Sequence, residues 1–441
     1  MKHRIAFINL PLVAVFLVLA STTALASSTW YVDGVHGSDN NNCKSPQTAC
    51  KTVGHAISLA HSGDSIKVAP ATYTDNTLTI RFSLKIIGSD ASTTIIDGGG
   101  VNTVVTISNA NAHVALSKLT ITKGFAYVVG GGIRNSGTLI VNNSMVSGNS
   151  ALYGGGGILN NGALTINNST LSGNGAGRGS RSVAVNYQAP ALPSGFGGGI
   201  LNNGTLTINN STVSRNSATS SPGGAGGGIW SNNRALTINN STLSGNSASH
   251  DDGGIVSGGA LTINNSTISG NSASGTIGGI DNSSGTATLQ NSIVANNSPG
   301  GNCSGTMTSN GYNLSSDNTC NFNGTGDLNN VDPKLGQLGN HGGPTQTIPL
   351  LSGSPAIDAG NPNGCTDDKG HLLKTDQRGR PRPDREDKSG CDMGAYEEQS
   401  QPKCIPLGDP CFGPGPLKCC PAFPRHTFCS SKTGYGYCLI D

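Results

Sequence analysis

The chain carries little charge for its length. Asp, Glu, Lys and Arg together make up 11% of the 441 residues, and the formal net charge is +2 at pH 7. Aromatic residues contribute only 5%, and the sequence has no basic stripe or row of aromatic side chains. Proteins that bind nucleic acid need clustered Lys and Arg to contact the phosphates. The composition therefore excludes this class, and we expect no nucleic-acid partner.

Long hydrophobic runs are missing after the first 26 residues. Those residues combine a basic start, an apolar core from Ile5 to Ala20 and the small-X-small sequence Ala24-Leu25-Ala26. This is the pattern of a secretory signal peptide cut before Ser27, and its apolar core is too short to be taken as a membrane span. We expect an exported mature chain without a transmembrane segment, either secreted, extracellular or held at the cell surface.

What the sequence has in abundance is a repeat between residues 130 and 300. An isoleucine that closes a glycine run recurs at Ile133, Ile158, Ile200, Ile229, Ile255 and Ile280. The spacings are 25, 42, 29, 26 and 25 residues. The basic period is therefore 25, with insertions in three of the copies.

Each copy contains three short segments in which apolar and polar residues alternate. In the second copy these are Gly157–Leu159, Leu164–Ile166 and Thr170–Ser172, separated by Asn, Gly and Ser. Alternation is strand periodicity with one face inward, and Asn, Gly and Ser favour turns. A 25-residue unit cannot bury its own apolar face, but stacked units can. The sequence predicts an all-β fold, a right-handed single-stranded parallel β-helix with about 25 residues per coil. Its inward residues would include Ile158, Leu164, Ile166, Leu171, Ile200, Leu206, Ile208 and Val213.

Asn-Asn-Ser triplets recur once per copy, beginning at Asn142, Asn167, Asn209, Asn239 and Asn264. In stacked coils their side-chain amides can bond from one coil to the next as a ladder. Each triplet also has the Asn-X-Ser pattern of a glycosylation acceptor. The regular spacing favours the ladder, because a glycan would obstruct stacking.

The segment before the repeats differs from them. Residues 29–33 have the pattern of a strand, and residues 51–61 that of an amphipathic helix with Val53, Ile57 and Ala60 on one face. A helix laid over the first coil would cover its exposed edge. The motifs Tyr31-Val32-Asp33, Gly37-Ser38-Asp39, Ser45-Pro46, Lys51-Thr52-Val53, Gly63–Ile66 and Ala69–Tyr73, in this order, resemble the N-terminal cap of secreted pectin-lyase-like β-helix proteins.

A second resemblance follows the repeats. The motifs Gly342–Thr347, Ser354–Asn361, Asp376–Pro383 and Asp392–Glu397 are similar to the C-terminal module of bacterial surface β-helix proteins often described as choice-of-anchor, in which interchangeable sorting tails follow. The Gly-Gly-Ile repeats also resemble those of polymorphic outer-membrane proteins. The expected domains are a signal peptide (1–26), an N-terminal cap (27–75), the coils (76–300), a C-terminal anchor-type module (301–398) and a cystine-knot-like domain (399–441).

Two segments of this plan concentrate the charge. The module holds Asp358, Asp376, Arg378, Arg380, Arg382 and Asp384. These residues could be a carboxylate pair with arginines for acid/base or sugar-acid chemistry, or an ion-pair network that pins a loop-rich end cap. The largest insertion, residues 177–194, contains Arg178 and Arg181, and is either a loop on a binding face or a plain surface loop.

The last 40 residues hold six of the twelve cysteines, in a pattern with an adjacent pair at its centre. Six cysteines in so short a segment indicate a small disulfide-stabilised domain, with fifteen possible pairings. A zinc site would need a closer set of ligands, but there is no Cys-X-X-Cys pair and only His426 is near. The spacing resembles the inhibitor cystine knot, which implies the pairs Cys404–Cys420, Cys411–Cys429 and Cys419–Cys438. For the rest of the chain we expect the local pairs Cys43–Cys50, Cys303–Cys320 and Cys365–Cys391.

Groups for catalysis are scarce in the repeats. Between residues 130 and 300 the only carboxylates are Asp251, Asp252 and Asp281, and there is no lysine. Galacturonan hydrolysis needs clustered carboxylates, and lyase chemistry needs a Lys or Arg base, usually with calcium held by several carboxylates. His250-Asp251-Asp252 is the one constellation there that could bind a metal or act as acid and base. The alternative interpretation is a solvated acidic turn.

These observations favour a non-catalytic secreted or cell-surface protein for adhesion or for contact with polysaccharide or cell-envelope components. On this hypothesis we expect no cofactor and no metal site. The alternatives are a polysaccharide lyase or glycoside hydrolase of the pectin-lyase-like group, with calcium for the lyase, and a rod that carries a knottin-like inhibitory or toxin-like tail.

Overall fold

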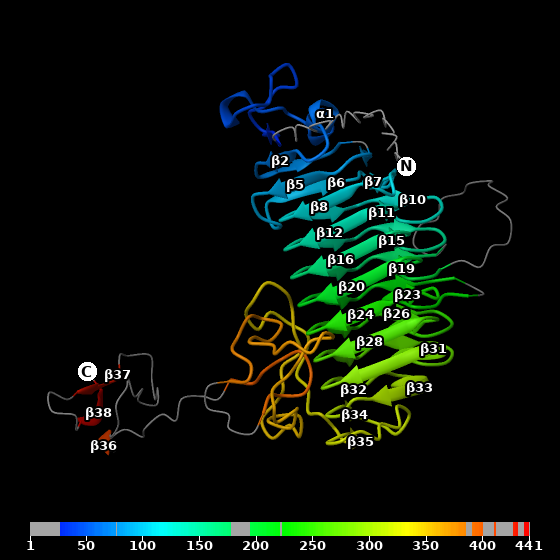
Figure 1. The fold of residues 1–441 in the computed structure, drawn as a ribbon, viewed down its shortest axis with the longest axis vertical. Helices are drawn as coiled ribbons and strands as arrows, with labels where there is room; N and C mark the ends of the chain where they lie inside the picture. Colours follow the sequence, from blue (N-terminus) through cyan, green and yellow to red (C-terminus); the bar gives the residue numbers. More distant parts are fainter. Residues whose placement is uncertain are drawn as a thin grey trace, which may run out of the picture.

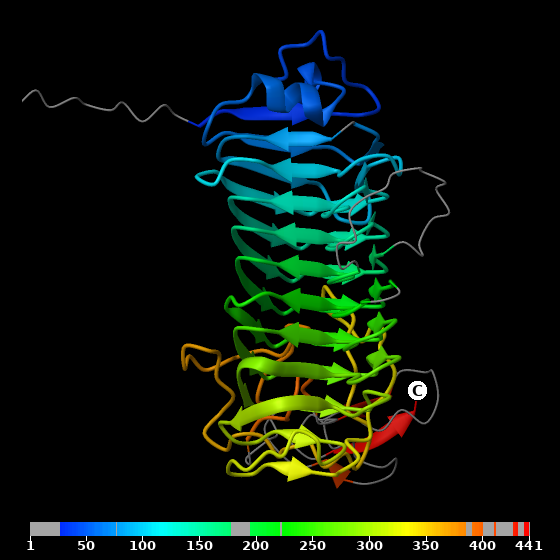
Figure 2. The ribbon, with the colours of Figure 1, turned by 90° about the vertical axis from the view of Figure 1, so that its right-hand side faces the viewer.

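The computed structural model describes residues 27–75, 77–177, 195–220, 223–384 and 390–399, and the backbone of three strands in the tail. In these residues short strands stack into three parallel sheets that wind up as a right-handed β-helix (Figure 1). Viewed after a quarter turn, the equivalent strands of successive coils lie one above another in a single column (Figure 2). The fold class predicted from the repeat is confirmed.

Sheet A is the largest of the three and takes two strands from most coils. Its strands are β1 (Thr29–Val32), β2 (Ser65–Val68), β4 (Leu78–Ile80), β5 (Leu84–Gly88), β7 (Val105–Ile107), β8 (His113–Ser117), β11 (Ile133–Asn135), β12 (Thr138–Asn142), β15 (Ile158–Asn160), β16 (Ala163–Asn167), β19 (Ile200–Asn202), β20 (Thr205–Asn209), β23 (Ile229–Ser231), β24 (Leu236–Asn239), β27 (Ile255–Ser257), β28 (Ala260–Asn264), β31 (Ile280–Gln290) and β33 (Cys303–Ser309).

Sheets B and C complete each coil. Sheet B contains β3 (Ala71–Tyr73), β6 (Thr94–Asp97), β9 (Thr120–Thr122), β13 (Met145–Ser147), β17 (Thr170–Ser172), β21 (Thr212–Ser214), β25 (Thr242–Ser244), β29 (Thr267–Ser269), β32 (Ile293–Ala295), β34 (Leu314–Ser315) and β35 (Leu328–Asn329). Sheet C contains β10 (Phe125–Ala126), β14 (Ser150–Ala151), β18 (Gly175–Ala176), β22 (Ser217–Ala218), β26 (Ser247–Ala248) and β30 (Ser272–Ala273). The strands of sheet C are two residues long, too short for alternation to reveal them in the sequence.

The core consists of equivalent residues stacked in columns. Leu164 pairs with Leu206, and Ile166 with Ile208, in a register that repeats from coil to coil. The isoleucines that close the glycine runs are fully buried, and the other residues predicted to point inward are at most 2% exposed. Each strand therefore buries its apolar face only because the next coil repeats the same residue at the same place.

The predicted asparagine ladder is present. Each triplet asparagine donates its side-chain N–H to the Oδ1 of the equivalent asparagine one coil earlier, at 2.8 Å (Asn167 to Asn142), 2.9 Å (Asn209 to Asn167), 3.1 Å (Asn239 to Asn209) and 3.0 Å (Asn264 to Asn239). A glycan on the Nδ2 of Asn167 would take the place of this bond.

A second asparagine ladder was not predicted, and it is more deeply buried. Its rungs come from the Ser-Gly-Asn, Ser-Arg-Asn and Ala-Asn-Asn turns after the sheet B strands, at Asn149, Asn174, Asn216, Asn246, Asn271 and Asn297. Asn174 is 1% exposed. It donates to the backbone oxygen of Val146 at 2.9 Å and to Asn216 Oδ1 at 2.9 Å, and it accepts from both nitrogens of Asn149.

The N-terminal end of the rod is covered as expected. The helix α1 (Val53–Leu59) is shorter than predicted, because Thr52 caps it and accepts from the backbone N–H of His55. Its residues Val53, Ala56 and Ile57 are buried, and the helix lies over the first coils (Figure 1). A 3-10 helix η1 (Pro46–Thr48) precedes it, and the predicted disulfide Cys43–Cys50 closes this loop.

The coils continue past the expected boundary at residue 300. β31 pairs with β33, β32 with β34 and β34 with β35, all in parallel. The β-helix thus extends to Asn329, with the predicted disulfide Cys303–Cys320 inside this final part. The 25-residue pattern fades there because the residue types change while the backbone pairing persists.

Residues 330–399 form a loop-rich module that the third predicted disulfide, Cys365–Cys391, crosslinks. The expectation that this module caps the end of the rod is wrong. It folds back along the flank of the later coils (Figure 1), where Thr212 donates to the backbone oxygen of Gln346 and Ala395 N–H donates to Thr267 Oγ1. The outward threonines of β21, β25 and β29 are consequently buried, whereas Thr170 of β17 is not.

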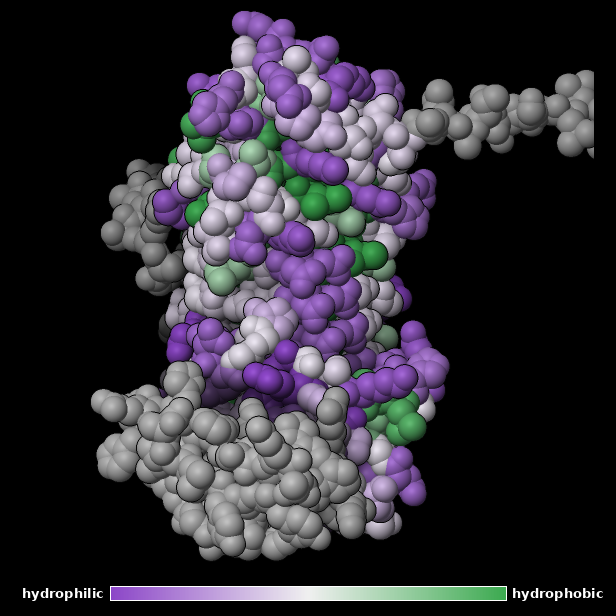
Figure 3. Space-filling view, turned by 90° about the vertical axis from the view of Figure 1, so that its left-hand side faces the viewer, coloured by the Kyte–Doolittle hydropathy of each residue, from purple (hydrophilic) through white to green (hydrophobic). Residues whose placement is uncertain are grey.

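The face that lies on the left in Figure 1 is mostly hydrophilic where it is coloured, and apolar groups show in its upper part (Figure 3). In the described residues no helix is long and apolar enough to span a bilayer. In the tail, β36 (Pro410–Cys411), β37 (Thr427–Ser430) and β38 (Gly436–Ile440) form an antiparallel sheet. The side chains of the six tail cysteines lie outside the described residues, so their pairing stays a prediction.

The buried ladder can be tested by Asn174→Ala. This change removes two donated bonds and the oxygen that accepts from both nitrogens of Asn149, so we expect the free energy of unfolding to fall by about 1–3 kcal/mol. Chemical denaturation followed by circular dichroism measures this. The matched control is Asn161→Ala, an exposed asparagine that accepts one bond from Asn203, for which we expect a change within about 0.5 kcal/mol. Equal effects of the two changes would contradict a stabilising role of burial in the ladder.

Candidate functional site

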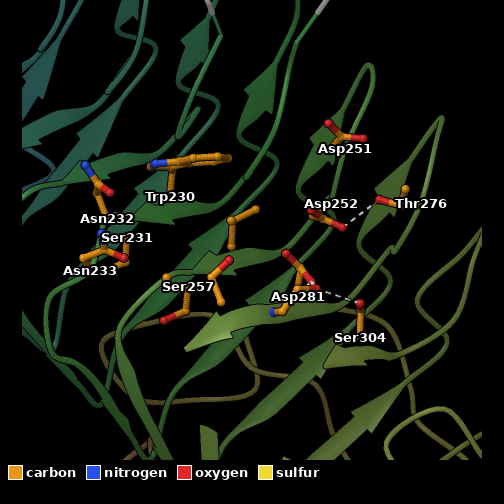
Figure 4. A pocket seen from close by; sticks show the side chains of 14 residues that line it. Trp230, Ser231, Asn232, Asn233, Asp251, Asp252, Ser257, Thr276, Asp281 and Ser304 are labelled. Atoms are coloured by element: carbon orange, nitrogen blue, oxygen red, sulfur yellow. Dashed lines mark hydrogen bonds between the residues drawn. The ribbon is translucent and has the colours of Figure 1, made fainter. Parts of the chain in front are cut away.

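A pocket of about 430 Å³ opens on the outer face of sheet A, over β23, β27, β31 and β33. It is lined by Trp230, Ser231, Asn232, Asn233, Asp251, Asp252, Val256, Ser257, Gly258, Thr276, Asp281, Ser283, Ser284 and Ser304. In Figure 4 the Trp230 ring lies on one side and the aspartates on the other, with Ser257 between them. All three carboxylates of residues 130–300 thus meet in one pocket, which their separation in the sequence did not reveal.

One outward column of sheet A forms the floor of the pocket. Parallel pairing aligns Leu201 with Trp230, Trp230 with Val256, Val256 with Asp281 and Asp281 with Ser304. The column therefore changes from apolar to aromatic to acidic along the rod. Phe196 packs against Trp230 with 4.4 Å between the ring centroids. This contact makes a broad aromatic surface next to the acidic end.

Asp252 is the most unusual residue in the pocket. The equivalent position in four earlier coils is Gly130, Gly155, Gly197 or Gly226, each with φ between 61° and 75°. Asp252 adopts the same left-handed backbone with φ 43°, a region that residues other than glycine visit only at a cost, although Asp is among those that tolerate it best.

The environment of Asp252 changes its acidity. The side chain is buried, with 6% exposed, and it accepts a hydrogen bond from Thr276 Oγ1 at 2.8 Å. Burial, together with repulsion from Asp281 and Asp251, raises the pKa of Asp252 to about 6. Buried carboxylates with raised pKa values are frequent at functional sites, and such a group can exchange a proton near neutral pH.

The other predicted site residues take different positions. Asp251 lines the pocket, but it is also half-exposed and pairs with His250 at 3.0 Å between Asp251 Oδ1 and His250 Nδ1. His250 is more than half exposed and does not line the pocket. Asp281, which the sequence showed only as an isolated carboxylate, accepts from the backbone N–H and hydroxyl of Ser283.

The described residues contain one group of side chains close enough to hold a metal ion together, and it lies outside the pocket. There, the only three His, Cys, Asp or Glu ligand atoms within 4.8 Å of one another belong to Cys43, Cys50 and His55. Cys43 and Cys50 form a disulfide, so they offer no thiolate to a metal. In this conformation the three aspartates of the pocket do not converge that closely, and they surround a cavity instead.

The charged segment near residue 380 is an ion-pair network. Arg378 pairs with Asp376 at 2.7 Å and Arg382 with Glu397 at 2.7 Å, with all four side chains buried. The Arg378 guanidinium also stacks on the Tyr396 ring, 3.5 Å from its centroid. These arginines and carboxylates therefore pair with one another within the module, although Oε1 of Glu397 is buried without a hydrogen-bond partner. Of the residues in the predicted patch, Asp358 instead donates its backbone N–H to Asp392.

This network also attaches the module to the rod. Arg382 donates to Asn240 Oδ1 at 3.0 Å. Gln377 donates to Thr212 Oγ1 and accepts from Thr242 Oγ1. These contacts support the structural interpretation of the charged patch over acid/base chemistry.

Trp230 and Phe196 are the site residues that the sequence reasoning missed. Both lie at positions where the repeat has other residues: Trp230 aligns with Leu201, and Phe196 with Gly154. Asp252 likewise replaces glycine. Comparing the copies column by column would have selected all three residues. The predicted binding loop at 177–194 lies, from residue 178 on, outside the described residues.

Comparison with known proteins establishes the fold. No protein-family model and no curated protein sequence matches the chain. Among solved structures, the crystal structure of pectate lyase Pel9A aligns with 85% of this chain and 97% of its own, at 15% identity and a TM-score of 0.51. A rhamnogalacturonan lyase aligns with 74% of this chain and 96% of its own, at 11% identity and a TM-score of 0.37. The first of these likenesses shows a shared parallel β-helix fold.

The docking of the module should depend on pH. Burial, followed by repulsion from Glu397, raises the pKa of Asp392 to about 7, and burial also raises the pKa of Glu397. The folded state therefore holds protons that the unfolded state releases above its ordinary pKa of about 4. This contribution to stability is present at low pH and is lost as the pH rises through about 7.

Hydrogen exchange at residues 376–382 should thus be slower at pH 5 than at pH 8, after correction for intrinsic rates. In Asp392→Asn the dependence should flatten, even though the variant loses one acceptor and is less stable throughout. The wild type and the variant share all other titrating groups, so the difference between their pH dependences of hydrogen exchange reports on Asp392. An unchanged slope in the variant would contradict this assignment.

Proposed function

We propose that the chain is a secreted β-helix protein that binds carbohydrate in the pocket beside Trp230, and that it acts in adhesion or cell-wall contact. The observation that carries this proposal is the placement of the Trp230–Phe196 aromatic surface next to Asp252 and Asp281. Sugars have apolar C–H faces and polar hydroxyls. A pocket with an aromatic wall and a few convergent polar groups suits such a ligand.

The remainder of the chain fits this proposal. Disulfides such as Cys303–Cys320 form in oxidising compartments, and the first 26 residues have the pattern of a signal peptide. The rod carries few charges, so its surface is not suited to nonspecific ionic attachment. The module would serve attachment at the surface, as its resemblance to anchor-type segments implies, and the knottin-like tail would take the place of an anchor and bind a partner or wall component.

The test is a glycan array and a cell-wall pull-down with the mature chain. In Trp230→Ala the aromatic wall is lost, and we expect retention on the bound glycan to weaken at least tenfold, about 1.4 kcal/mol. The matched control is Tyr127→Ala, which removes an exposed ring outside the pocket and should leave binding unchanged. Binding that is equal in the two variants, or no retention of the wild type, would refute the proposal.

A second candidate function is glycoside hydrolysis, for which Asp252 provides a specific observation. Its pKa of about 6 keeps a large fraction protonated in mildly acidic solution, as a general acid for a glycosidic oxygen requires. Asp281 or Asp251 would then be the second carboxylate. A lyase is less supported, because none of the residues that line the pocket is a Lys or Arg that could act as the base.

Hydrolysis is tested by the release of reducing ends from each polysaccharide that binds. If Asp252 is the acid, Asp252→Asn should lower kcat by at least about 100-fold with the fold retained, because Asn has nearly the same shape and also tolerates the left-handed backbone. Activity in the wild type should fall as the pH rises above about 6. Equal rates in the variant and the wild type would rule out this role.

A further inference from the structure

We infer that the pocket beside Trp230 selects a glycan with a protonated amine, an amino sugar, over neutral sugars and uronic acids. The inference rests on the proposed carbohydrate binding and specifies the chemical class of the ligand. It follows from three features of the pocket: the sign of its charges, the burial of one carboxylate and the position of the indole ring.

The charged residues that line the pocket are all acidic. Asp251, Asp252 and Asp281 line the pocket, and none of the other lining residues is Lys, Arg or His. His250, the basic residue next in sequence, is outside the lining and pairs with Asp251. A chain with a net charge of +2 therefore concentrates negative charge at one concave place, where low-dielectric walls focus the field.

Asp252 lacks a buried cation as partner. Thr276 provides a neutral hydrogen bond, and the neighbouring charges of Asp251 and Asp281 oppose ionisation. Burying a carboxylate in this way is unfavourable unless a positive group compensates it. A ligand ammonium among these aspartates would supply the missing positive charge. By contrast, a uronic acid would add a fourth carboxylate, and like charges placed together in an interface cost several kcal/mol.

Trp230 adds a surface for the sugar ring that carries the amine. An indole is a large apolar ring, on which the C–H face of a sugar can pack. The ring is half-buried and is supported from behind by Phe196. A sugar over this ring would place its apolar face on the indole and an amine toward Asp281, the acidic residue two coils along the same column.

The column continues beyond the pocket toward the N-terminus through Leu201 and the buried Leu159. Successive positions in this column are one coil apart, which is about 4.8 Å. An extended oligosaccharide lying along the rod axis could therefore contact Leu201 and Trp230 with its neutral units and the aspartates with a charged one, whereas Leu159 is covered.

The experiment is isothermal titration of the mature chain with oligosaccharides of equal length. The probes are β-1,4-linked glucosamine, its N-acetylated counterpart, and galacturonate oligomers with calcium or with a chelator. At pH 6.5 we expect the glucosamine oligomer to bind at least tenfold more tightly than the N-acetylated one, and galacturonate not to bind.

Three variants locate the effect. Asp252→Gly restores the glycine of the other coils, so it should fold at least as well as the wild type, yet it should lose tenfold or more in affinity for glucosamine oligomers. Asp281→Asn should show a similar loss. Asp332→Asn removes an exposed carboxylate outside the pocket and should bind like the wild type, which distinguishes the pocket from general attraction of a cationic polymer.

Each remaining outcome overturns the inference. If both glucosamine forms bind equally and Trp230→Ala abolishes binding, carbohydrate binding stands but selection of the amine is wrong. If galacturonate binds more tightly with calcium, the pocket uses a bridging cation and the inference is wrong. If Asp332→Asn weakens binding as much as Asp252→Gly, the attraction is nonspecific. If no sugar binds, the proposed function fails as well.

Discussion

The in-register stacking of coils is the constraint on which the rest of this structure depends. The backbone N–H and C=O groups of a strand bond to the equivalent strands of the coils before and after it, so every side chain is placed directly above its counterpart. A parallel strand isolated from its neighbours would leave these groups unsatisfied. Asparagine suits the turns because its amide is both donor and acceptor and can repeat the backbone pairing with side chains. The buried ladder through Asn174 and Asn216 is therefore a polar line of bonds that runs beside the apolar columns inside the rod.

The same constraint explains how a binding pocket arises in so regular a molecule. A residue that departs from its column changes the surface without disturbing the pairing on either side. Trp230 in the column of Leu201 and Asp252 in the column of Gly226 are departures of this kind. The left-handed backbone at Asp252 is maintained because the coils before and after it fix the turn. The pairing with those coils offsets the cost of this backbone conformation. The pocket thus consists of residues that differ from the repeat, on a backbone whose pairing is unaffected by them.

The period of 25 was sufficient to predict the β-helix, its inward residues and the triplet ladder, because stacking converts sequence spacing directly into position. It could not predict where the module binds. Thr212 and Thr242, which the module covers, stand in the same sequence context as Thr170, which stays partly exposed. The docking partners, such as Gln377, are more than 130 residues away in the sequence, where periodicity gives no information. Nor did the sequence separation of Asp252 and Asp281 reveal their proximity, although they are close to one coil apart. The pairing of the six tail cysteines stays a prediction, because their side chains lie outside the described residues.

The lateral docking of the module has a mechanical consequence. Gln399, the last described residue before the tail, belongs to a module that is bonded sideways to several coils, through Gln377 to β21 and β25 and through Arg382 to Asn240. Tension applied through that end would load these bonds together and in shear, instead of peeling the last strand from the stack one bond at a time. The Cys365–Cys391 disulfide limits how far the loop can extend. The force needed to detach this end of the chain should therefore be larger than the force that would separate the two-residue strand β35 from β34.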